Sequence, residues 1–145
     1  MDYKLKKGMD GITAIIINRK NNMVLFLKRR SLPFIVNPGI FSFVSGKRKH
    51  GEMYINTAYR EIYEETKLSK NELEFLYDGD IRVYYKRYFW NNRFYVFATD
   101  KTQIRLNIEN SSYVWVYYKD INKDYLKMFL DKRYIINIIK KCILR

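Results

Sequence analysis

The sequence is poor in the residues that cross-link or interrupt a chain. Of its 145 residues, one is cysteine, one is histidine and two are proline. A single cysteine, Cys142, excludes a disulfide framework within the chain and is compatible with a reducing cytoplasm, where we expect the protein to be located. The N-terminus lacks the apolar core of a signal peptide, and no run approaches the ~20 apolar residues that span a membrane. These absences predict a soluble protein without a membrane partner.

Acidic residues are also scarce. The chain has 28 Lys and Arg against 15 Asp and Glu, which gives a formal net charge of +13. A positive field raises the local concentration of polyanions, so this charge suits a nucleotide, a polyphosphate or an RNA end as ligand. A solvated basic surface carries the same charge, and the charge alone does not separate the two interpretations.

Apolar residues, in contrast, are abundant. The hydrophobic fraction is 48% and the aromatic fraction 17%, with 14 tyrosines. Disordered chains have low hydrophobicity, so this composition predicts a folded protein. The length predicts a single domain over residues 1–145, large enough to bury its own core. The sequence does not specify an oligomeric state.

The strongest chemical pattern lies in residues 46–68, which read GKRKHGEMYINTAYREIYEETKL. We expect a helix over residues 52–68. On a helix Glu61, Glu64 and Glu65 stand at i, i+3 and i+4 and therefore share one face. Like charges at this spacing repel each other, and clustered carboxylate oxygens are what Mg²⁺ and Mn²⁺ prefer. The pattern predicts a site for Mg²⁺, with Mn²⁺ as the alternative.

The same stretch resembles the signature of the Nudix hydrolases, which spaces Gly, Glu, Arg-Glu, an apolar residue, Glu-Glu, Gly and an apolar residue in a set order. These positions are Gly46, Glu52, Arg60, Glu61, Ile62, Glu64, Glu65, Lys67 and Leu68. Only Lys67 departs, because the family has glycine there. A left-handed residue caps the helix at that point, which for lysine costs ~1–2 kcal/mol. Either Lys67 tolerates this strain, or the helix runs on toward Ser69 or Asn71; we expect an altered helix exit and an intact metal site.

The resemblance implies a fold and a reaction. The fold is an α/β/α sandwich with a mixed β-sheet, and the reaction is Mg²⁺-dependent hydrolysis of a nucleoside diphosphate linked to another moiety. Family members differ in which carboxylate takes the proton of the attacking water, and we favour Glu61. Glu64 and Glu65 are then the principal metal ligands, and Glu52 assists them. Arg60, four residues before Glu64, is predicted to hold that glutamate in position.

Two further metal ligands are predicted outside the helix. In some Nudix proteins, the backbone carbonyl before the first glycine binds the metal, and Ser45 occupies that place. Some also place a loop carboxylate on the metals, which here is Glu109, six residues before Trp115. A solvated loop acid is the equally weighted alternative for Glu109.

Four residues are predicted to bind the substrate. A basic residue that follows the second strand commonly reaches the substrate in Nudix proteins, and we favour Arg29 among Lys28, Arg29 and Arg30. Phe34 lies in the proline-containing loop and can stack on a base, although a loop anchor is the alternative role. Lys47 belongs to the basic loop after Gly46. Tyr85 matches a position where dinucleoside polyphosphate hydrolases tend to carry tyrosine.

Hydrophobic patterns predict the remaining elements. Alternating or β-branched runs predict strands over residues 11–18, 23–30, 41–46, 72–78, 81–89, 93–100 and within 107–121. Turns are predicted at residues 18–22 and at Trp90-Asn91-Asn92. A final helix over 131–145 is expected to be capped by Asp131 and to carry an apolar stripe from Tyr134 to Cys142.

Three functions remain open at this level. The leading one is hydrolysis of a nucleoside triphosphate or dinucleoside polyphosphate. The second is cleavage of capped or triphosphorylated RNA 5′ ends, which uses the positive charge directly. The third is a non-catalytic Nudix-fold module that binds nucleotides or RNA. The complete set of three helix glutamates argues against the third, because a domain without catalysis need not retain costly clustered carboxylates.

Overall fold

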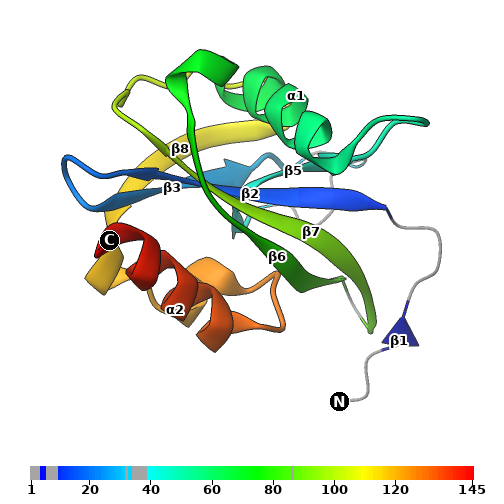
Figure 1. The fold of residues 1–145 in the computed structure, drawn as a ribbon. Helices are drawn as coiled ribbons and strands as arrows, with labels where there is room; N and C mark the ends of the chain where they lie inside the picture. The colour runs from blue at the N-terminus through cyan, green and yellow to red at the C-terminus, as the bar shows by residue number, and fades with distance from the viewer. Residues whose placement is uncertain (1–3, 6–9, 32, 34–38, 86) are drawn as a thin grey trace.

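Strand β2 (Gly11–Asn18) forms the centre of the sheet. All eight of its residues are buried, as expected of a β-branched segment covered on both faces. One edge pairs in parallel with β7 (Tyr88–Thr99). The other edge pairs antiparallel, first with β5 (Val44–Lys47) and then with β3 (Met23–Arg29). The sheet is therefore mixed, as predicted (Figure 1).

The structure, a computed structural model, describes residues 4–5, 10–31, 33, 39–85 and 87–145, and only the backbone of Lys4, Leu5 and Tyr85. The remaining strands are β1 (Lys4–Leu5), β4 (Phe41–Ser42), β6 (Glu74–Tyr85) and β8 (Asn110–Tyr117). The helices are α1 (Tyr54–Thr66) and α2 (Lys132–Ile143). Three short 3₁₀ segments, η1 (Lys70–Glu72), η2 (Tyr118–Asp120) and η3 (Lys123–Leu126), connect them.

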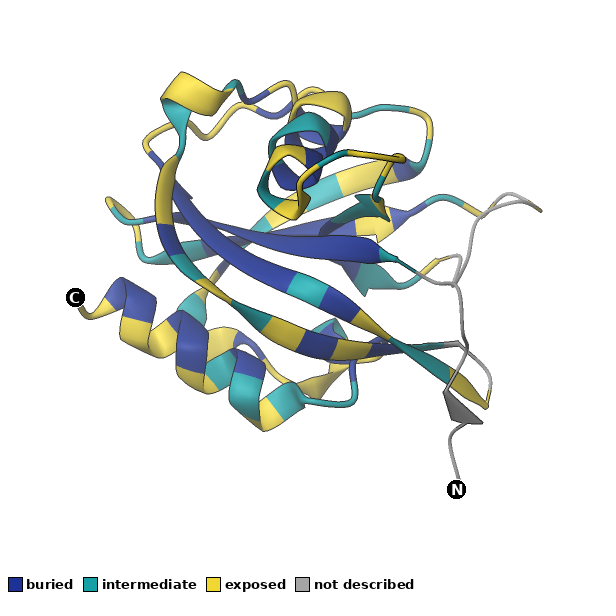
Figure 2. Cartoon of the chain, turned by 45° about the vertical axis from the view of Figure 1, so that its right-hand side comes forward, coloured by how far each residue is buried: buried dark blue, intermediate teal, exposed yellow. Residues whose placement is uncertain are grey.

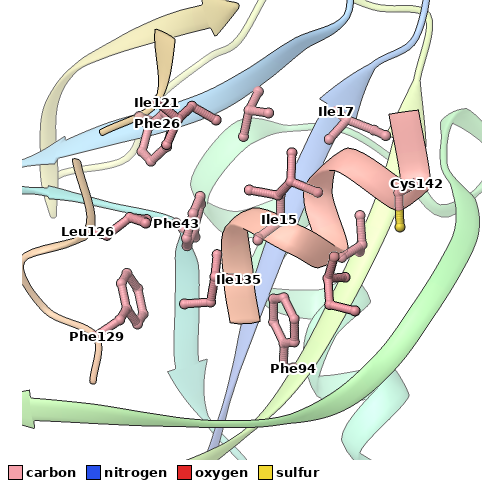
Figure 3. Close-up of a cluster of buried hydrophobic side chains, with 14 of the residues drawn as sticks. Ile15, Ile17, Phe26, Phe43, Phe94, Ile121, Leu126, Phe129, Ile135 and Cys142 are labelled. Carbon is pink, nitrogen blue, oxygen red and sulfur yellow. The ribbon is translucent and has the colours of Figure 1, made fainter. Parts of the chain in front are cut away.

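The two faces of the sheet carry separate cores. Successive strand residues point to opposite faces, so Ile15 and Ile17 of β2 face one layer, whereas Ala14 and Ile16 face the other. The first layer contains α2 and the aromatic residues that Figure 3 shows around Phe43 and Phe129. The second contains α1. Figure 1 shows the two helices on opposite sides of the sheet, and in Figure 2 the buried residues of α2 face the strands. This is the predicted α/β/α sandwich.

The predicted turn at Trp90-Asn91-Asn92 is wrong. β6 and β7 pair from Glu74 with Ala98 to Tyr85 with Tyr88, with one register shift between Phe75 and Tyr77, so the chain reverses between Tyr85 and Tyr88. The two asparagines lie inside β7. Asn92 is tolerated there because its side chain is buried and hydrogen-bonded to β2, a tertiary contact that outweighs its local preference for turns.

The predicted strands over 72–78 and 81–89 do not correspond to two separate strands: residues 74–78 and 81–85 belong to one strand, β6, and residues 88 and 89 already belong to β7. β6 passes through Gly79 without a break. A Cβ at Gly79 would lie 2.6 Å from the Tyr134 hydroxyl of α2, so glycine here permits the close approach of a side chain. The predicted strand over 41–46, in contrast, is divided at Phe43 into β4 and β5.

The final helix forms with the predicted stripe but without the predicted cap contact. Ile135, Ile138, Ile139 and Cys142 are buried. Asp131 occupies the N-cap position, but its carboxylate accepts hydrogen bonds from the backbone N–H and guanidinium of Arg82. An ion pair to β6 thus replaces the local cap. In the described part of the chain, no helix is long and apolar enough to cross a membrane.

The backbone conformation of Lys67 decides between the two alternatives predicted for the end of helix α1. Helix α1 ends at Thr66, and Lys67 adopts φ 63° and ψ 15°, the left-handed conformation, with its N–H donated to the Tyr63 carbonyl. Lysine therefore tolerates the strain, and the expected alteration of the exit does not occur. The chain ends this helix with the same backbone conformation that glycine would supply.

Replacing Lys67 by glycine is expected to stabilise the protein by about 1 kcal/mol, because glycine adopts the left-handed conformation without steric cost. Urea denaturation measures this change. The hydrolytic rate should stay at the wild-type value, because the glutamates lie upstream of this residue. A loss of stability would show that the Lys67 side chain, which lies over the Tyr63 ring, contributes more than its backbone strain costs.

Candidate active site

Helix α1 turns two of its glutamates toward the sheet and one toward solvent. The Glu61 and Glu65 side chains lie one turn apart on the face beside β5, and the two residues are 8% and 1% exposed. Glu64 is exposed. The Ser45 N–H lies 3.3 Å from Glu65 Oε2. Two of the three carboxylates predicted to share one face are therefore buried against β5, whereas the third is exposed.

The approach of Glu61 to β5 depends on Gly46. A Cβ at this position would lie 2.0 Å from Glu61 Cδ, which is far inside van der Waals contact. The glycine of the pattern is therefore needed for space: the Glu61 carboxyl group lies directly against the strand backbone.

The two buried carboxyl groups lie in an electrostatically unfavourable place. Burial, followed by the charges of Glu61 and Glu109, raises the pKa of Glu65 well above its ordinary value. Burial also raises the pKa of Glu61, which the hydrogen bond from Arg60 partly offsets. Asn110 Nδ2 donates a hydrogen bond to Glu65 Oε1 at 3.3 Å. Carboxylates gathered in this way require positive charge nearby.

Arg60 supplies part of that charge. Its Nε and Nη2 donate to the two oxygens of Glu52 at 2.9 and 3.0 Å, and its Nη1 donates to Glu61 Oε1 at 2.8 Å. The predicted contact with Glu64 is present but longer, at 3.4 Å. Nη2 also donates to the Lys47 carbonyl at 3.0 Å. Arg60 therefore orients Glu61 and ties the helix to the basic loop.

Glu52 is held by protein donors. Besides Arg60, the Lys49 N–H and the Thr57 hydroxyl donate to its Oε1 at 3.1 and 2.7 Å. The hydrogen bonds from Arg60, the largest effect, lower the pKa of Glu52 to about 2. Its role as an assistant ligand stays a prediction, whereas the structure shows it fixing Arg60.

Arg29 and Glu109 approach the glutamates from other strands. Arg29 is the last residue of β3 and is 8% exposed. Burial lowers its pKa, and the charges of Glu65 and Glu109 act in the opposite direction. Glu109 lies in the turn before β8 and is half-buried, which disfavours its interpretation as a solvated loop acid. These two residues are adjacent to the α1 carboxylates although they are far from them in sequence.

A cavity of about 180 Å³ lies beside this group. Of the predicted residues, four line it: Arg29, Ser45, Lys47 and Glu109. Glu61 and Glu65 lie behind the same wall, against Gly46 and Ser45, which do line it. Phe34 and the side chain of Tyr85 lie outside the described residues.

Several lining residues were missed by the sequence analysis. They come from strand interiors and from the segment before α2, and are Asp10, Gly11, Thr13, Ser42, Phe43, Val83, Trp90, Asn92, Met128 and Phe129. The polar Asn92 within an aromatic strand was the one available signal, and it suggested a turn instead.

The acidic residues have the chemistry of a divalent-cation site. Among the described residues, no three His, Cys, Asp or Glu side chains are already close enough together to hold a metal ion. The chemical fit rests on oxygen donors: two buried carboxyl groups with raised pKa values, together with the half-buried Glu109. Hard cations such as Mg²⁺ select oxygen ligands of this kind.

Comparison with known proteins agrees with this geometry. A family model for the NUDIX domain matches residues 8–137. No curated protein in the comparison matches the chain.

Similar solved structures include a C. elegans Ap4A hydrolase in a binary complex, with TM-score 0.70, 17% identity, and coverage of 92% of this chain and 93% of that one. The E. coli dihydroneopterin triphosphate pyrophosphohydrolase has TM-score 0.68, 18% identity and 99% coverage of both chains. The MutT protein of Methanosarcina mazei has TM-score 0.67, 20% identity, and coverage of 97% and 94%. At these identities the structures show a shared fold.

Because the family model matches most of the chain, and the fold and glutamate helix agree with it, the chain belongs to the Nudix hydrolases, enzymes that act on diphosphate bonds.

Proposed function

We propose that this enzyme is a Mg²⁺-dependent pyrophosphohydrolase whose substrate is a nucleoside diphosphate linked to another moiety, such as a nucleoside triphosphate or a dinucleoside polyphosphate. The observation that carries the proposal is the position of the α1 carboxyl groups. Glu61 and Glu65 lie behind the wall of a cavity that Arg29 and Lys47 line. The carboxyl groups attract a cation, whereas Arg29 and Lys47 attract a diphosphate.

The metal would be held by Glu61, Glu64 and Glu65, with the Ser45 carbonyl, Glu52 and Glu109 as further ligands. A bound Mg²⁺ neutralises diphosphate charge and lowers the pKa of a bound water, and Mn²⁺ serves the same chemistry. These residues supply the oxygen ligands that both ions prefer. The like charges that raise the pKa values of Glu61 and Glu65 would then be balanced.

The protein's own side chains have three roles in this reaction. Glu61 takes the proton of the attacking water, and Arg60 orients it through the 2.8 Å hydrogen bond to Oε1. Arg29 and Lys47, both on the cavity wall, bind the phosphates and stabilise negative charge on the departing oxygen. The largely apolar walls exclude bulk water, which strengthens these interactions.

A substrate panel tests the proposal. It contains ADP-ribose, diadenosine tetraphosphate, normal and oxidised nucleoside triphosphates, and capped RNA, each with Mg²⁺, with Mn²⁺ and with EDTA. We expect metal-dependent cleavage of a diphosphate bond in at least one nucleotide. Cleavage of capped RNA alone would favour the RNA-end reaction. Steeply salt-dependent RNA binding without turnover of any substrate would reject catalysis in favour of a binding module.

A further inference from the structure

The cavity is lined by charged and by apolar residues. Arg29, Lys47 and Glu109 are charged lining residues, besides Asp10. The apolar walls come from Phe43, Val83, Trp90, Met128 and Phe129. Phe43 and Phe129 are almost fully buried and pack with ring centroids 5.3 Å apart, so they belong to the core (Figure 3). Trp90 is half-buried, which leaves part of its indole for a ligand.

Asn92 is the polar residue that β7 places beside this aromatic wall. It is 5% exposed. Its Nδ2 donates to Thr13 Oγ1 at 2.9 Å and to the Ile12 carbonyl at 3.4 Å. A backbone carbonyl can only accept hydrogen bonds, so these contacts determine which way the amide is turned. Oδ1 must therefore point away from Ile12.

Asn92 Oδ1 has no hydrogen-bond donor among the residues that the structure describes. A buried acceptor without a donor costs about 1–3 kcal/mol, and native proteins rarely leave one without a functional reason. Gly11 lies next to this oxygen: a Cβ there would stand 3.3 Å from Oδ1. Gly11 also lines the cavity and has no side chain, so no Cβ fills the space next to this buried oxygen.

Two other acceptors of the cavity wall are engaged by protein donors. The Asp10 carboxylate accepts hydrogen bonds from the Tyr54 hydroxyl and from Arg48, which together lower its pKa. Thr13 Oγ1 accepts from Asn92. Beside Trp90, Asn92 is thus the residue whose acceptor calls for a donor from a ligand.

We propose that Asn92 determines base specificity: Oδ1 accepts a hydrogen bond from the exocyclic amino group of adenine or cytosine, while the base stacks on Trp90. The inference rests on the proposed function, because it assumes that the diphosphate lies against Arg29 and Lys47. Stacking tolerates any base, whereas a single buried acceptor discriminates an amino group from an oxo group at the same ring position. The enzyme therefore prefers adenine and cytosine nucleotides over the analogues that carry an oxo group at the same ring position.

Steady-state kinetics with matched substrate pairs test the preference. ATP is compared with ITP, and CTP with UTP, in the wild type and in Asn92→Leu. The wild type should favour the amino member roughly 10- to 100-fold in kcat/KM, because the oxo analogue leaves Oδ1 unpaired. Asn92→Leu should reduce the ratio to near one by lowering the rate with the amino substrate. Trp90→Ala should raise KM for all four nucleotides and keep the ratio.

A binding measurement separates this inference from the proposed function. Quenching of Trp90 fluorescence in a Trp115→Phe background, with EDTA present, reports binding of AMP, IMP and purine riboside 5′-monophosphate, which lacks the amino group. Tighter binding of AMP than of both analogues, by a protein that cleaves no substrate of the metal-containing panel, would support the base site and reject hydrolysis. Equal binding of all three, or an amino-to-oxo ratio that Asn92→Leu leaves unchanged, would overturn the base site. Because the ligands themselves delete the donor, the test holds even if Asn92→Leu does not fold.

Discussion

Glu65→Gln is expected to lower kcat on the order of 10²- to 10³-fold while the fold is retained. Glutamine has the same shape but cannot supply a second buried negative charge beside Glu61 and Glu109. The metal-free variant should therefore melt at the wild-type temperature or above it, because burial and like charges oppose the ionised form of Glu65 in the wild type. Turnover of the best substrate from the panel measures the first effect, and circular dichroism measures the second.

Glu74→Gln is the matched control for this substitution, because Glu74 lies outside residues 46–68. Glu74 begins β6, is largely exposed and pairs with Arg19 at the protein surface. Glu74→Gln should change the free energy of unfolding by less than about 0.5 kcal/mol and leave kcat unaltered. Wild-type turnover by Glu65→Gln, with Mg²⁺ still raising its melting temperature, would remove Glu65 from the metal site.

Gly46→Ala is expected to lower kcat/KM about 100-fold or more, because its Cβ would require the Glu61 carboxyl group to move. The new methyl group would stand 2.0 Å from Glu61 Cδ and 2.4 Å from Cγ. Overpacking of this kind costs about 1–3 kcal/mol of stability, which the β2–β5 pairing should withstand. Kinetics and urea denaturation of the same preparation separate a displaced side chain from a lost fold.

Gly51→Ala is the control for that substitution. Gly51 has φ 76°, and a Cβ there would meet no atom within 4 Å. Alanine should cost about 1 kcal/mol of backbone strain without affecting the hydrolytic rate. If Gly46→Ala and Gly51→Ala lost stability equally and both kept full activity, the close contact between Gly46 and Glu61 would have no role in catalysis.

The reaction class could be predicted because its determinants are close together in the sequence. Residues 46–68 comprise the end of β5, one loop and one helix, so helical spacing alone places Glu61, Glu64 and Glu65 within about one turn of each other. Local chemistry also correctly predicted the buried strand β2 and the stripe of α2. Periodicity is reliable there because one face of each element packs against a single layer.

Where local preference and tertiary contact disagreed, the prediction failed. Asn91 and Asn92 favour turns in isolation, yet pairing with β2 and β6 keeps both inside β7. Asp131 is a good helix cap by composition, but an ion pair with Arg82 of β6 uses its carboxylate. Lys67 disfavours the left-handed conformation, and the packed helix imposes it. In each case a contact formed only after folding outweighed about 1 kcal/mol of local preference.

The cavity beside the α1 glutamates results entirely from the tertiary structure. Its walls come from β2, β3, β4, β5, β6, β7 and the segments before β8 and α2, which no local pattern connects. Neither the unpaired oxygen of Asn92 nor the half-buried ring of Trp90 is visible in the order of residues, because both result from strand pairing. The catalytic chemistry therefore follows from a short stretch of sequence, whereas the choice of substrate depends on which distant strands the sheet brings side by side.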